Sequence, residues 1–575
     1  MNRREFLKKS IQVVVTTLSL SVLPASDILG RSELVKRYMK KHPLGKRINY
    51  DSVQITKAMQ SVLKIKYKNP LPKALSINII IDKDINIPCG ENNNPITEVI
   101  PISKVQVETD KGSEEISIVK INISPELFAG SPIYVDVQSK HPKQIRPIEM
   151  EFEFSAAPIV ENKHDIEGYT SFVTYNPGEK IELKVHSPLP SFSIDFIRYG
   201  AEEKLVHQIK NVSGTKQNYD LYAYRNGANW ETSHVFQIPL DWQTGLYGAR
   251  LYDSSGKEFH VSFNLRDTSY VSRPKNKRIA ILSSTNTWQA YNSWGGASLY
   301  WYSAPDHIKP SDSAQLISTQ RPNPSATPVG LVTHLTSGEK CILAWLEKNH
   351  FPYSLISDWD LHHQPHLLND FGTLIINTHG EYWTKEMYDA LEQFLDHGGN
   401  VIYLSGNGCY WKTVIKENWM EVKKDGAHHL LNGERGGLWR DLNRTESGVL
   451  GVRFNGPATN MFYPYKIKNA DHWIFANTGL KNGDLVGEKG LLGGASGHET
   501  DIMDEFTPKN TILLAKGANP KKKQGAEMIY YDHPKGGGVF SVGSIAFGSS
   551  LIVDPILSKI VKNVLDRFLS NNGLK

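Results

Sequence analysis

The order of apolar and polar positions divides the chain into stretches with different periods. From about residue 61 to residue 155, short runs such as "VLKIKYK", "SINIIID" and "EISIVKINIS" alternate apolar and polar residues between polar turns. This alternation is typical of strands that bury one face, so it predicts an antiparallel β-domain. A second stretch, about 165–267, repeats the pattern around the turn "NPGEK" and the loop "DSSGKE", and its spacing favours an immunoglobulin-like β-sandwich.

After about residue 277 the apolar runs become continuous and alternate with helical periods. "RIAILSS", "GTLIINTH" and "VIYLSG" lack polar alternation, as expected of strands buried on both faces. "EKCILAWLEKNH" and "TKEMYDALEQFLDHGGN" have helical spacing, and the second ends on Gly398–Gly399. Strands that alternate with helices indicate a doubly wound, mostly parallel α/β sheet of amidotransferase-like type. In such sheets ligands bind beyond the carboxyl ends of the strands.

The amino terminus has a pattern of its own. A basic stretch, "MNRREFLKKS", precedes an apolar one, "IQVVVTTLSLSVLP". About fourteen apolar-leaning residues are few for a membrane span, which needs roughly twenty, and suit a removable signal peptide. Arg3–Arg4 with the following "EFLK" resembles the twin-arginine export motif, although Asn2 stands where Ser or Thr is usual. We therefore expect a periplasmic or secreted protein without a stable membrane span once the signal is removed; an uncleaved anchor is the alternative.

These patterns predict a mixed fold in four segments, with β-domains first and an α/β domain last. They are a signal peptide at 1–30, a β-rich domain at 31–160, an immunoglobulin-like sandwich at 161–270 and an α/β domain at 275–575.

Composition excludes several classes of site and partner. The net charge is only +5, and the sequence has no basic block or aromatic–basic repeat, so nucleic-acid binding has no support. Three widely spaced cysteines, Cys89, Cys341 and Cys409, exclude a disulfide framework and a Cys-rich zinc or iron–sulfur site. A bound metal would therefore take oxygen or nitrogen ligands.

Three loops rich in aromatic residues follow predicted strands. They are "TNTWQAYNSWGGASLYWY" at 285–302, "HGEYW" at 379–383 and "GNGCYW" at 406–411. Because the carboxyl ends of parallel strands meet at one edge of a sheet, we expect the three loops to face one crevice. The first loop supplies four candidate substrate-binding residues, for which simple packing is the alternative: Trp288, Tyr291, Asn292 and Trp294.

Two mechanisms can be built at this crevice. In one, Cys409 is a nucleophile on a strand-to-helix elbow and His379 is its base. Trp411 would crowd such an elbow, and a buried cysteine is more often a small hydrophobe. In the other, Tyr382 and Tyr410 give phenolate oxygens to a hard metal, since only a strongly charged cation makes tyrosine an anionic ligand at neutral pH. A carboxylate would be the natural third ligand.

Several sequence blocks resemble the N,N-dimethylformamidase large (beta) subunit family over about residues 165–570. These blocks are "STNTWQAYNSWGGASLY", "HGEYW", "GGNVIYLSGNGCYW", "GGASGHETD" and "GGGVFSVGSIAF". The resemblance implies a mononuclear, non-haem Fe³⁺ held by two tyrosines and one glutamate. It places the tyrosines on Tyr382 and Tyr410 and the glutamate on Glu499.

The resemblance also implies an acidic catalytic base in "AEMIYYDHPKGGG", where Glu527 and Asp532 are both candidates. His379 and His498 flank the presumed ligands and would orient them or carry protons. Iron in this setting would polarise an amide carbonyl or lower the pKa of bound water.

The leading prediction is thus an exported, metal-dependent hydrolase of amide carbon–nitrogen bonds. Its substrate would be a small amide or a larger amide-bearing ligand, and a homo-oligomer is possible. The named family has a separate small subunit, which the extra β-domain at 61–155 could replace. The rival prediction is a non-catalytic exported protein that binds a glycan or other surface ligand through its aromatic loops.

Overall fold

The computed structural model describes residues 159–570 with gaps at 301–314, 425, 427–428, 430, 433 and 521–524, and it describes seven strands before residue 159. The signal peptide expected at 1–30 and Cys89 lie outside the described residues. The chain divides into two compact units. The first unit is Met1–Pro158 with Ser303–Leu316 and Leu430–Glu434, and the second is Ile159–Tyr302 with Ile317–His429 and Arg435–Lys575.

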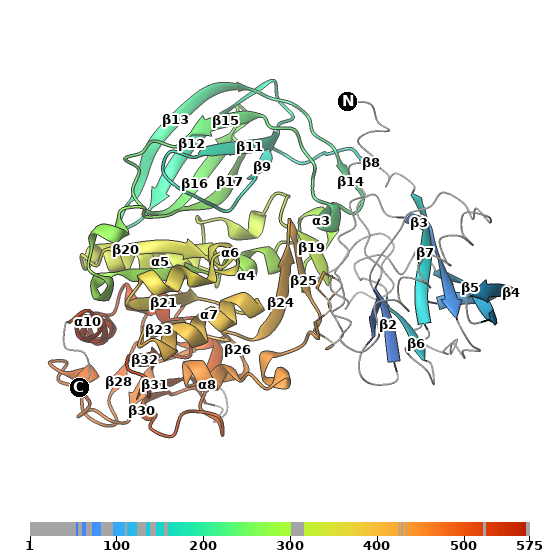
Figure 1. Cartoon of the computed structure of the whole chain (residues 1–575). Coiled ribbons are helices and arrows are strands. Elements are labelled where there is room, and N and C mark those ends of the chain that lie inside the picture. The colour runs from blue at the N-terminus through green and yellow to red at the C-terminus, as the bar shows by residue number, and fades with distance from the viewer. Residues whose placement is uncertain are drawn as a thin grey trace. The chain divides into compact units, whose positions relative to one another are not determined.

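The first unit holds two antiparallel sheets, coloured blue to cyan in Figure 1. Their strand orders are β4-β5-β3-β7 and β1-β2-β6. The bounds are β1 Val53–Ile55, β2 Gln60–Lys64, β3 Pro72–Ile81, β4 Ile96–Thr109, β5 Gly112–Ile123, β6 Tyr134–Gln138 and β7 Ile145–Phe154. Every pairing within these two sheets is antiparallel, as the period-two alternation of this stretch predicts.

A β-sandwich opens the second unit (Figure 1). One sheet has the order β10-β17-β16-β12-β13 and the other β15-β11-β9. The bounds are β9 Glu167–Thr170, β10 Thr174–Tyr175, β11 Lys180–His186, β12 Ser191–Tyr199, β13 Glu203–Ser213, β15 His234–Gln237, β16 Gly245–Tyr252 and β17 Glu258–Leu265. Alternate residues of β11, such as Ile181 and Leu183, share one apolar core with Phe196 and Phe263 of the facing sheet. Its assignment to the immunoglobulin-like class stays a prediction.

A nine-stranded sheet forms the centre of the second unit, in the order β20-β18-β21-β23-β32-β31-β30-β27-β28. The bounds are β18 Ile279–Ser283, β20 Tyr353–Ser357, β21 Thr373–Thr378, β23 Asn400–Ser405, β27 Tyr465–Ile467, β28 Leu485–Val486, β30 Ile512–Gly517, β31 Glu527–Asp532 and β32 Gly538–Ser541. The five strands from β20 to β32 are parallel.

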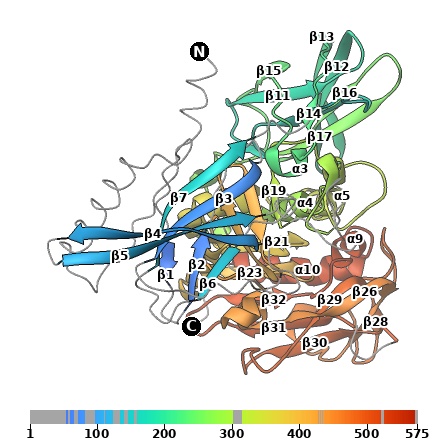
Figure 2. The same cartoon turned by 90° about the vertical axis from the view of Figure 1, so that its right-hand side faces the viewer.

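The sheet departs from the mostly parallel one that the sequence predicts. Its four strands from β31 to β28 are antiparallel, and Figure 2 shows β30, β31 and β32 in succession. The turn at 533–537 joins β31 directly to β32, and a turn this short can connect only antiparallel strands. The sheet is therefore mixed, with its parallel half built from strands that alternate with helices.

The parallel strands are apolar on both faces because each face has its own core. Ile281 of β18 packs in one cluster with Leu346 and Val564, whereas its neighbour Leu282 packs in another with Leu391. Successive side chains of a strand point to opposite faces, so a continuous apolar run serves both cores. The helices are α3 Ala223–Asn226, α4 Thr285–Ala290, α5 Thr336–Lys348, α6 Asp358–His363, α7 Lys385–Asp396, α8 Glu446–Leu450, α9 Phe547–Leu551 and α10 Pro555–Leu569. Within the described residues, none of them is long and apolar enough to cross a membrane.

Two smaller β-elements lie beyond the carboxyl ends of the parallel strands. β22 (Tyr382–Trp383) follows β21 and pairs with β24 (Trp411–Lys416), which follows β23 and continues into β25 (Trp419–Val422). The second element is an antiparallel ribbon of β26 (Arg453–Tyr463) and β29 (Ser496–Ile502). Both elements carry candidate ligands, so the fold places them at the edge of the sheet where ligands usually bind.

Candidate active site

Main-chain hydrogen bonds join the loop after β21 to the loop after β23. The amide of Cys409 donates to the carbonyl of Gly380 at 2.9 Å, and the amide of Tyr410 donates to the carbonyl of Glu381 at 3.0 Å. Tyr382 then pairs with the residue after Tyr410 in parallel register. The two candidate tyrosine ligands therefore stand side by side because their loops form one small sheet.

A third segment, β29, brings Glu499 to these loops. The carbonyl of Glu499 accepts a hydrogen bond from the amide of Ile545 at 3.4 Å. A Cβ atom on Gly406 would lie 2.6 Å from that carbonyl oxygen and 2.8 Å from the Ile545 nitrogen. Only glycine allows the backbone to approach so closely, so Gly406 is what lets β29 dock against the end of β23.

The imidazole of His379 lies between two carboxylates. Its Nε2 is 3.1 Å from Glu499 Oε2 and 3.3 Å from Glu381 Oε2. Burial alone would lower the pKa of His379, but the two carboxylates outweigh burial and raise it. Thr287 of α4 donates a hydrogen bond of 2.7 Å to the His379 carbonyl and so fixes the backbone below the ring.

The two carboxylates differ in charge state because their surroundings differ. Glu499 also accepts a hydrogen bond of 2.9 Å from Asn407 Nδ2. Burial opposes ionisation of Glu499, yet His379 and Asn407 lower its pKa to about 2. The single O–H of Tyr300 donates to the carboxylate of Glu381, whose two oxygens lie 2.5 and 2.6 Å away, and burial raises the pKa of Glu381 to about 7. Glu499 is thus an anion, and Glu381 holds a proton over part of the neutral range.

The hydroxyl of Tyr382 is fully buried and has no hydrogen-bond partner in the described part of the chain. A buried hydroxyl without a partner loses its bonds to water and gains nothing in return. Burial, together with the charges of Glu381 and Glu499, raises the pKa of Tyr382 well above its ordinary value, and the nearby Tyr300 hydroxyl only partly opposes the rise. Without a cation Tyr382 therefore stays a neutral phenol, and a hard cation would satisfy its oxygen as phenolate.

Tyr410 is half-buried and lies beside a cation. The Arg440 guanidinium carbon is 5.1 Å from the centre of the Tyr410 ring, and Phe454 meets the ring edge-on at 5.2 Å. Burial raises the pKa of Tyr410; Arg440 opposes the rise, and the charges of Glu381 and Glu499 add to it. Since Glu499 acts electrostatically on both tyrosines, the three predicted ligands share one region of the protein.

The donor set fits the iron that the sequence predicts. In the described residues, no group of three or more His, Cys, Asp or Glu side chains is arranged to hold a metal ion, so a metal here would depend on the tyrosine oxygens. Tyr382, Tyr410 and Glu499 would offer three oxygen donors. Glu499 is already anionic, and the buried hydroxyl of Tyr382 has no hydrogen bond to the residues that the structure describes. Hard, highly charged cations prefer such ligands.

An aromatic wall lies next to the centre. The ring of Tyr291 stacks on Tyr300 at 4.2 Å and meets His334 at 4.5 Å. His334 in turn stacks on His498 at 4.9 Å and lies 5.3 Å from His379. Burial lowers the pKa of His334 to about 3 and also lowers that of His498, so both rings are neutral. Tyr291 and His498 therefore lie near His379, and their roles stay predictions.

Three other residues of the predicted substrate loop are held by the protein itself. Trp288 is buried and donates its indole N–H to Glu339 at 2.9 Å. Asn292 donates to the Pro322 carbonyl and accepts from the Trp294 amide. Trp294 packs in a cluster with residues of the sandwich and donates to Glu167 at 2.8 Å. The structure thus gives all three the packing role that was the alternative.

The two candidate acidic bases lie at opposite ends of β31. Asp532 pairs with Gly538 at the start of β32, which is the edge of the sheet away from the candidate ligands, and it accepts a hydrogen bond from Tyr530. Glu527 lies at the other end of β31, where it accepts from Lys516 at 2.6 Å and from the Met503 amide at 2.8 Å. The structure does not bring Asp532 to the site, and Glu527 already has two donors.

Cys409 is fully buried in the apolar cluster that also contains Tyr403 and Trp383. Burial raises the pKa of its thiol well above the ordinary value, so the thiolate that a nucleophile needs is disfavoured. Its φ angle of 51° lies in the left-handed region, as does that of Asn407 at 52°. These two residues let the chain reverse after β23 and present Tyr410.

Sequence reasoning missed several residues of the centre. Glu381 belongs to the quoted block "HGEYW" but was not singled out, although a carboxylate between a histidine and a tyrosine is a usable signal. Tyr300 and Asn407 also stand in quoted blocks, beside residues that attracted more attention. His334 lies in "LVTHLT", which has no feature that marks it out.

The comparisons with known proteins decide the family. The family described as N,N-dimethylformamidase beta subunit-like, C-terminal, matches residues 193–559. The chain belongs to this family. A relative from Alcaligenes sp, named N,N-dimethylformamidase beta subunit, is 24% identical over 65% of this chain and 58% of its own length. One of the same name from Paracoccus aminophilus is 29% identical over 40% of this chain and 36% of its own length.

The chain therefore spans less than two thirds of the length of the relatives that it matches. Among solved structures, the mmIFT52 N-terminal domain matches 39% of this chain and 89% of its own, with 11% identity and a TM-score of 0.22. The match to the family includes the sandwich from residue 193 onward and all three predicted ligands.

Proposed function

We propose that this member of the N,N-dimethylformamidase beta subunit-like family hydrolyses amide carbon–nitrogen bonds with a mononuclear, non-haem Fe³⁺. One observation carries the proposal: the buried hydroxyl of Tyr382, which has no hydrogen bond to any described residue, lies in the same region as the carboxylate of Glu499, whose pKa is about 2. Tyr410, on the adjoining loop, completes the set of three oxygen donors. The names of the two relatives support amide hydrolysis as the reaction.

Bound Fe³⁺ would supply Lewis-acid chemistry, which polarises a carbonyl or lowers the pKa of a bound water. Tyr382, Tyr410 and Glu499 would hold the ion. His379 Nε2 lies within 3.3 Å of both Glu381 and Glu499 and can hold a proton between them. A carboxyl group that titrates near neutral pH, as Glu381 does, is suited to take up and return a proton during hydrolysis.

The aromatic wall sets the class of substrate. Tyr291, Tyr300 and the neutral imidazoles of His334 and His498 offer flat, uncharged surfaces beside the centre. Such a wall offers a flat contact surface to a small amide, and the ammonium group of Lys424 lies 3.9 Å from the centre of the Tyr300 ring. A second subunit is part of the proposal, since both relatives are named as beta subunits.

Export by the twin-arginine route remains part of the proposal as well. It rests on Arg3–Arg4 and the short apolar run that follows. Replacing both arginines with lysine should leave the protein in the cytoplasm, and cell fractionation with an antibody measures the outcome. Equal periplasmic amounts of the wild type and the Arg3→Lys, Arg4→Lys variant would exclude this route.

Metal analysis and visible spectroscopy test the proposed centre. The purified full chain, loaded with Fe³⁺, should contain one iron per chain and show a tyrosinate-to-iron charge-transfer band. The band should be lost in Tyr410→Phe and Glu499→Gln and kept in Cys409→Ser, and hydrolysis of N,N-dimethylformamide should follow the band. Hydrolysis that disappears only in Cys409→Ser would favour Cys409 as the nucleophile. A wild-type protein that binds no metal and shows no turnover would favour the non-catalytic binding protein.

A further inference from the structure

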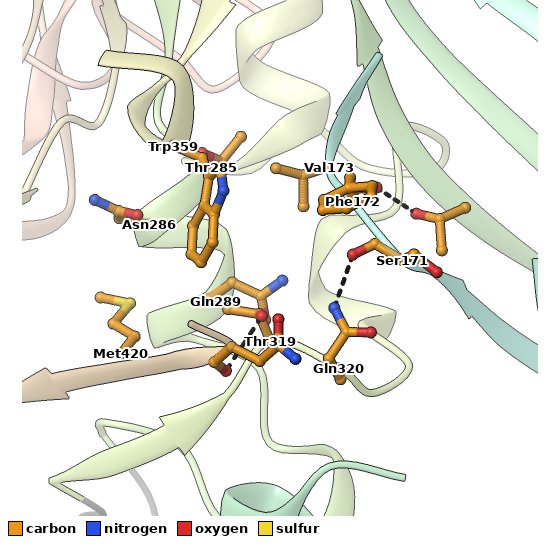
Figure 3. A pocket seen from close by; sticks show the side chains of 12 residues that line it. Ser171, Phe172, Val173, Thr285, Asn286, Gln289, Thr319, Gln320, Trp359 and Met420 are labelled. Carbon is orange, nitrogen blue, oxygen red and sulfur yellow. Dashed lines mark hydrogen bonds between the residues drawn. The ribbon is translucent and has the colours of Figure 1, made fainter. Parts of the chain in front are cut away.

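A second pocket opens in the second unit, lined by the turn between β9 and β10 and by one face of α4 (Figure 3). Its cavity volume is about 30 Å³, and the rest of the site is open to solvent. The wall is completed by Thr319 and Gln320, by Trp359 of α6 and by the hairpin between β24 and β25. The enclosed part has room for a polar group of a few atoms, so any larger part of a ligand would lie in the open mouth.

None of the residues that line this pocket is charged. Its apolar surface comes from Phe172, Trp359 and Met420, and Figure 3 shows Phe172 and Trp359 on different sides of the same space. Its polar surface comes from hydroxyl and carboxamide groups. An ion placed here would lose its hydration without gaining a counter-charge, so the pocket selects a neutral molecule. Two aromatic side chains favour one with a flat face.

The carboxamide of Gln289 supplies the polar contact. Gln289 is only 7% exposed, and its side-chain oxygen has no hydrogen-bond partner in the described part of the chain. The hydroxyl of Thr285, one helical turn away, is also buried and lacks a partner there. Rotation about the last side-chain bond lets Gln289 turn either its oxygen or its NH₂ group to a ligand. It therefore offers one donor and one acceptor in a plane, which is the complement of another amide.

The turn that carries Phe172 is held in a fixed shape. Thr170 Oγ1 donates to the Phe172 carbonyl at 2.7 Å, and the Phe172 amide donates to the Tyr175 hydroxyl at 3.1 Å. Gln320 Nε2 donates to the Ser171 carbonyl at 2.8 Å, a bond drawn in Figure 3. Despite this anchoring, Phe172 remains 59% exposed. The protein thus orders a large apolar side chain and leaves it open to solvent at the mouth of the pocket.

From these features we propose that the pocket is an accessory binding site for a neutral primary or secondary amide with a flat substituent. The amide group pairs with Gln289, and the substituent lies between Phe172 and Trp359. The site is separate from the candidate metal centre, and its occupation needs no metal. The proposal therefore goes beyond the proposed function and can fail or hold independently of it.

Helix α4 connects this pocket with the centre. Thr285, Asn286 and Gln289 line the pocket, and Asn286 Nδ2 also donates to the Tyr382 carbonyl at 3.0 Å. On the same helix, Thr287 donates to the His379 carbonyl. A molecule bound in the pocket would therefore contact the helix that holds the backbone of Tyr382 and of His379.

Benzamide is a suitable probe, and binding to the full chain can be followed by calorimetry or ligand-observed NMR. We expect Phe172→Ala to weaken binding about three- to tenfold, the effect of one lost aromatic contact. Gln289→Leu, which keeps the side-chain size, should weaken binding to a similar degree through the lost amide pair. Benzoate should bind at least about tenfold more weakly than benzamide, because its charge has no partner.

Phe506→Ala is the matched control, since Phe506 is similarly exposed at 57% but does not line the pocket. It should leave benzamide binding unchanged. Tyr410→Phe should remove the iron band and keep benzamide binding, which separates this proposal from that of the centre. Unchanged affinity in both Phe172→Ala and Gln289→Leu, or loss of binding in Tyr410→Phe alone, would overturn the proposal. Tighter binding of methyl α-glucoside than of benzamide would overturn the ligand class.

Discussion

Removal of one hydroxyl group, in Tyr382→Phe, distinguishes a metal ligand from an ordinary core tyrosine. This hydroxyl is buried and has no hydrogen bond within the part of the chain that the structure describes, and such a group costs about 1–3 kcal/mol. Tyr382→Phe should therefore leave the metal-free protein as stable as the wild type or more stable, by up to about 3 kcal/mol. In the iron-loaded protein the same variant should lose the stabilisation that a bound ion gives to the folded state.

Tyr403→Phe is the matched control for this experiment, because Tyr403 is equally buried but fully paired. Its hydroxyl donates to Asp501 at 2.8 Å and accepts from the Gly408 amide at 2.6 Å. Its loss should lower the free energy of unfolding by about 1–3 kcal/mol, with or without iron. Both variants remove the same atom. In the metal-free protein their free energies of unfolding should therefore differ by roughly 2 kcal/mol or more, which is about 2 °C in Tm for a unit of this size.

Thermal unfolding in chelator and again after iron loading measures both effects. The expected pattern is that iron raises the Tm of the wild type and of Tyr403→Phe but not that of Tyr382→Phe. If metal-free Tyr382→Phe is destabilised as much as Tyr403→Phe, the hydroxyl has a protein partner and the argument for the ligand fails. If iron raised the Tm of Tyr382→Phe as much as that of the wild type, the argument for Tyr382 as a metal ligand would also fail.

Three further predictions follow from the packing around the centre. Cys409→Ala should keep iron and hydrolysis within about twofold of the wild type, because the thiol is buried and its raised pKa disfavours the thiolate; a loss of more than tenfold in kcat would contradict this. Gly406→Ala should lose iron and about 1–3 kcal/mol of stability, since its Cβ would lie 2.6 Å from the Glu499 carbonyl oxygen. Gly448→Ala is the control, because its Cβ would meet only the Thr445 hydroxyl, at 3.2 Å, and it should keep both. Iron titration and thermal unfolding of the two variants measure the difference. Glu347→Gln should cost about 1–3 kcal/mol at pH 7, because Glu347 accepts from Arg198, Tyr353 and the Ala201 amide. Arg198 outweighs burial and lowers the pKa of Glu347, so Glu347 stabilises the folded state fully at pH values above its unfolded pKa of about 4.5. In urea unfolding, the difference in free energy of unfolding between wild type and variant should therefore shrink as the pH falls below that value.

The parts of the site that sequence could predict are those that depend on local pattern and on a general rule of α/β sheets. Continuous apolar runs marked β18, β21 and β23, and the aromatic loops after them meet at one edge, as that rule requires. The antiparallel half of the sheet was missed because the short strands β30 and β31 carry no signal for direction. Direction follows from the turn at 533–537 and from pairing partners far away in the sequence.

The roles of single aromatic residues could not be predicted in the same way. Trp288, Trp294 and Tyr291 share one loop and one kind of side chain, yet two are bound to buried glutamates and one faces the histidines. The difference lies in which partner each meets in three dimensions. The role of Glu499 could not be predicted from local pattern either, because it stands 117 positions after Tyr382. Only the resemblance to a family linked the two residues.

The close approach at Gly406 has a consequence for the order in which the protein can be made. The turn after β23 rests on the Glu499 carbonyl and on the Ile545 nitrogen, so its final shape needs segments that a ribosome synthesises last. A nascent chain that ends before residue 545 has both tyrosines but lacks the support that sets their loop against β29. Loading of the proposed iron would then be confined to the finished polypeptide, and the proposed export would need a secretion pathway that transports folded proteins.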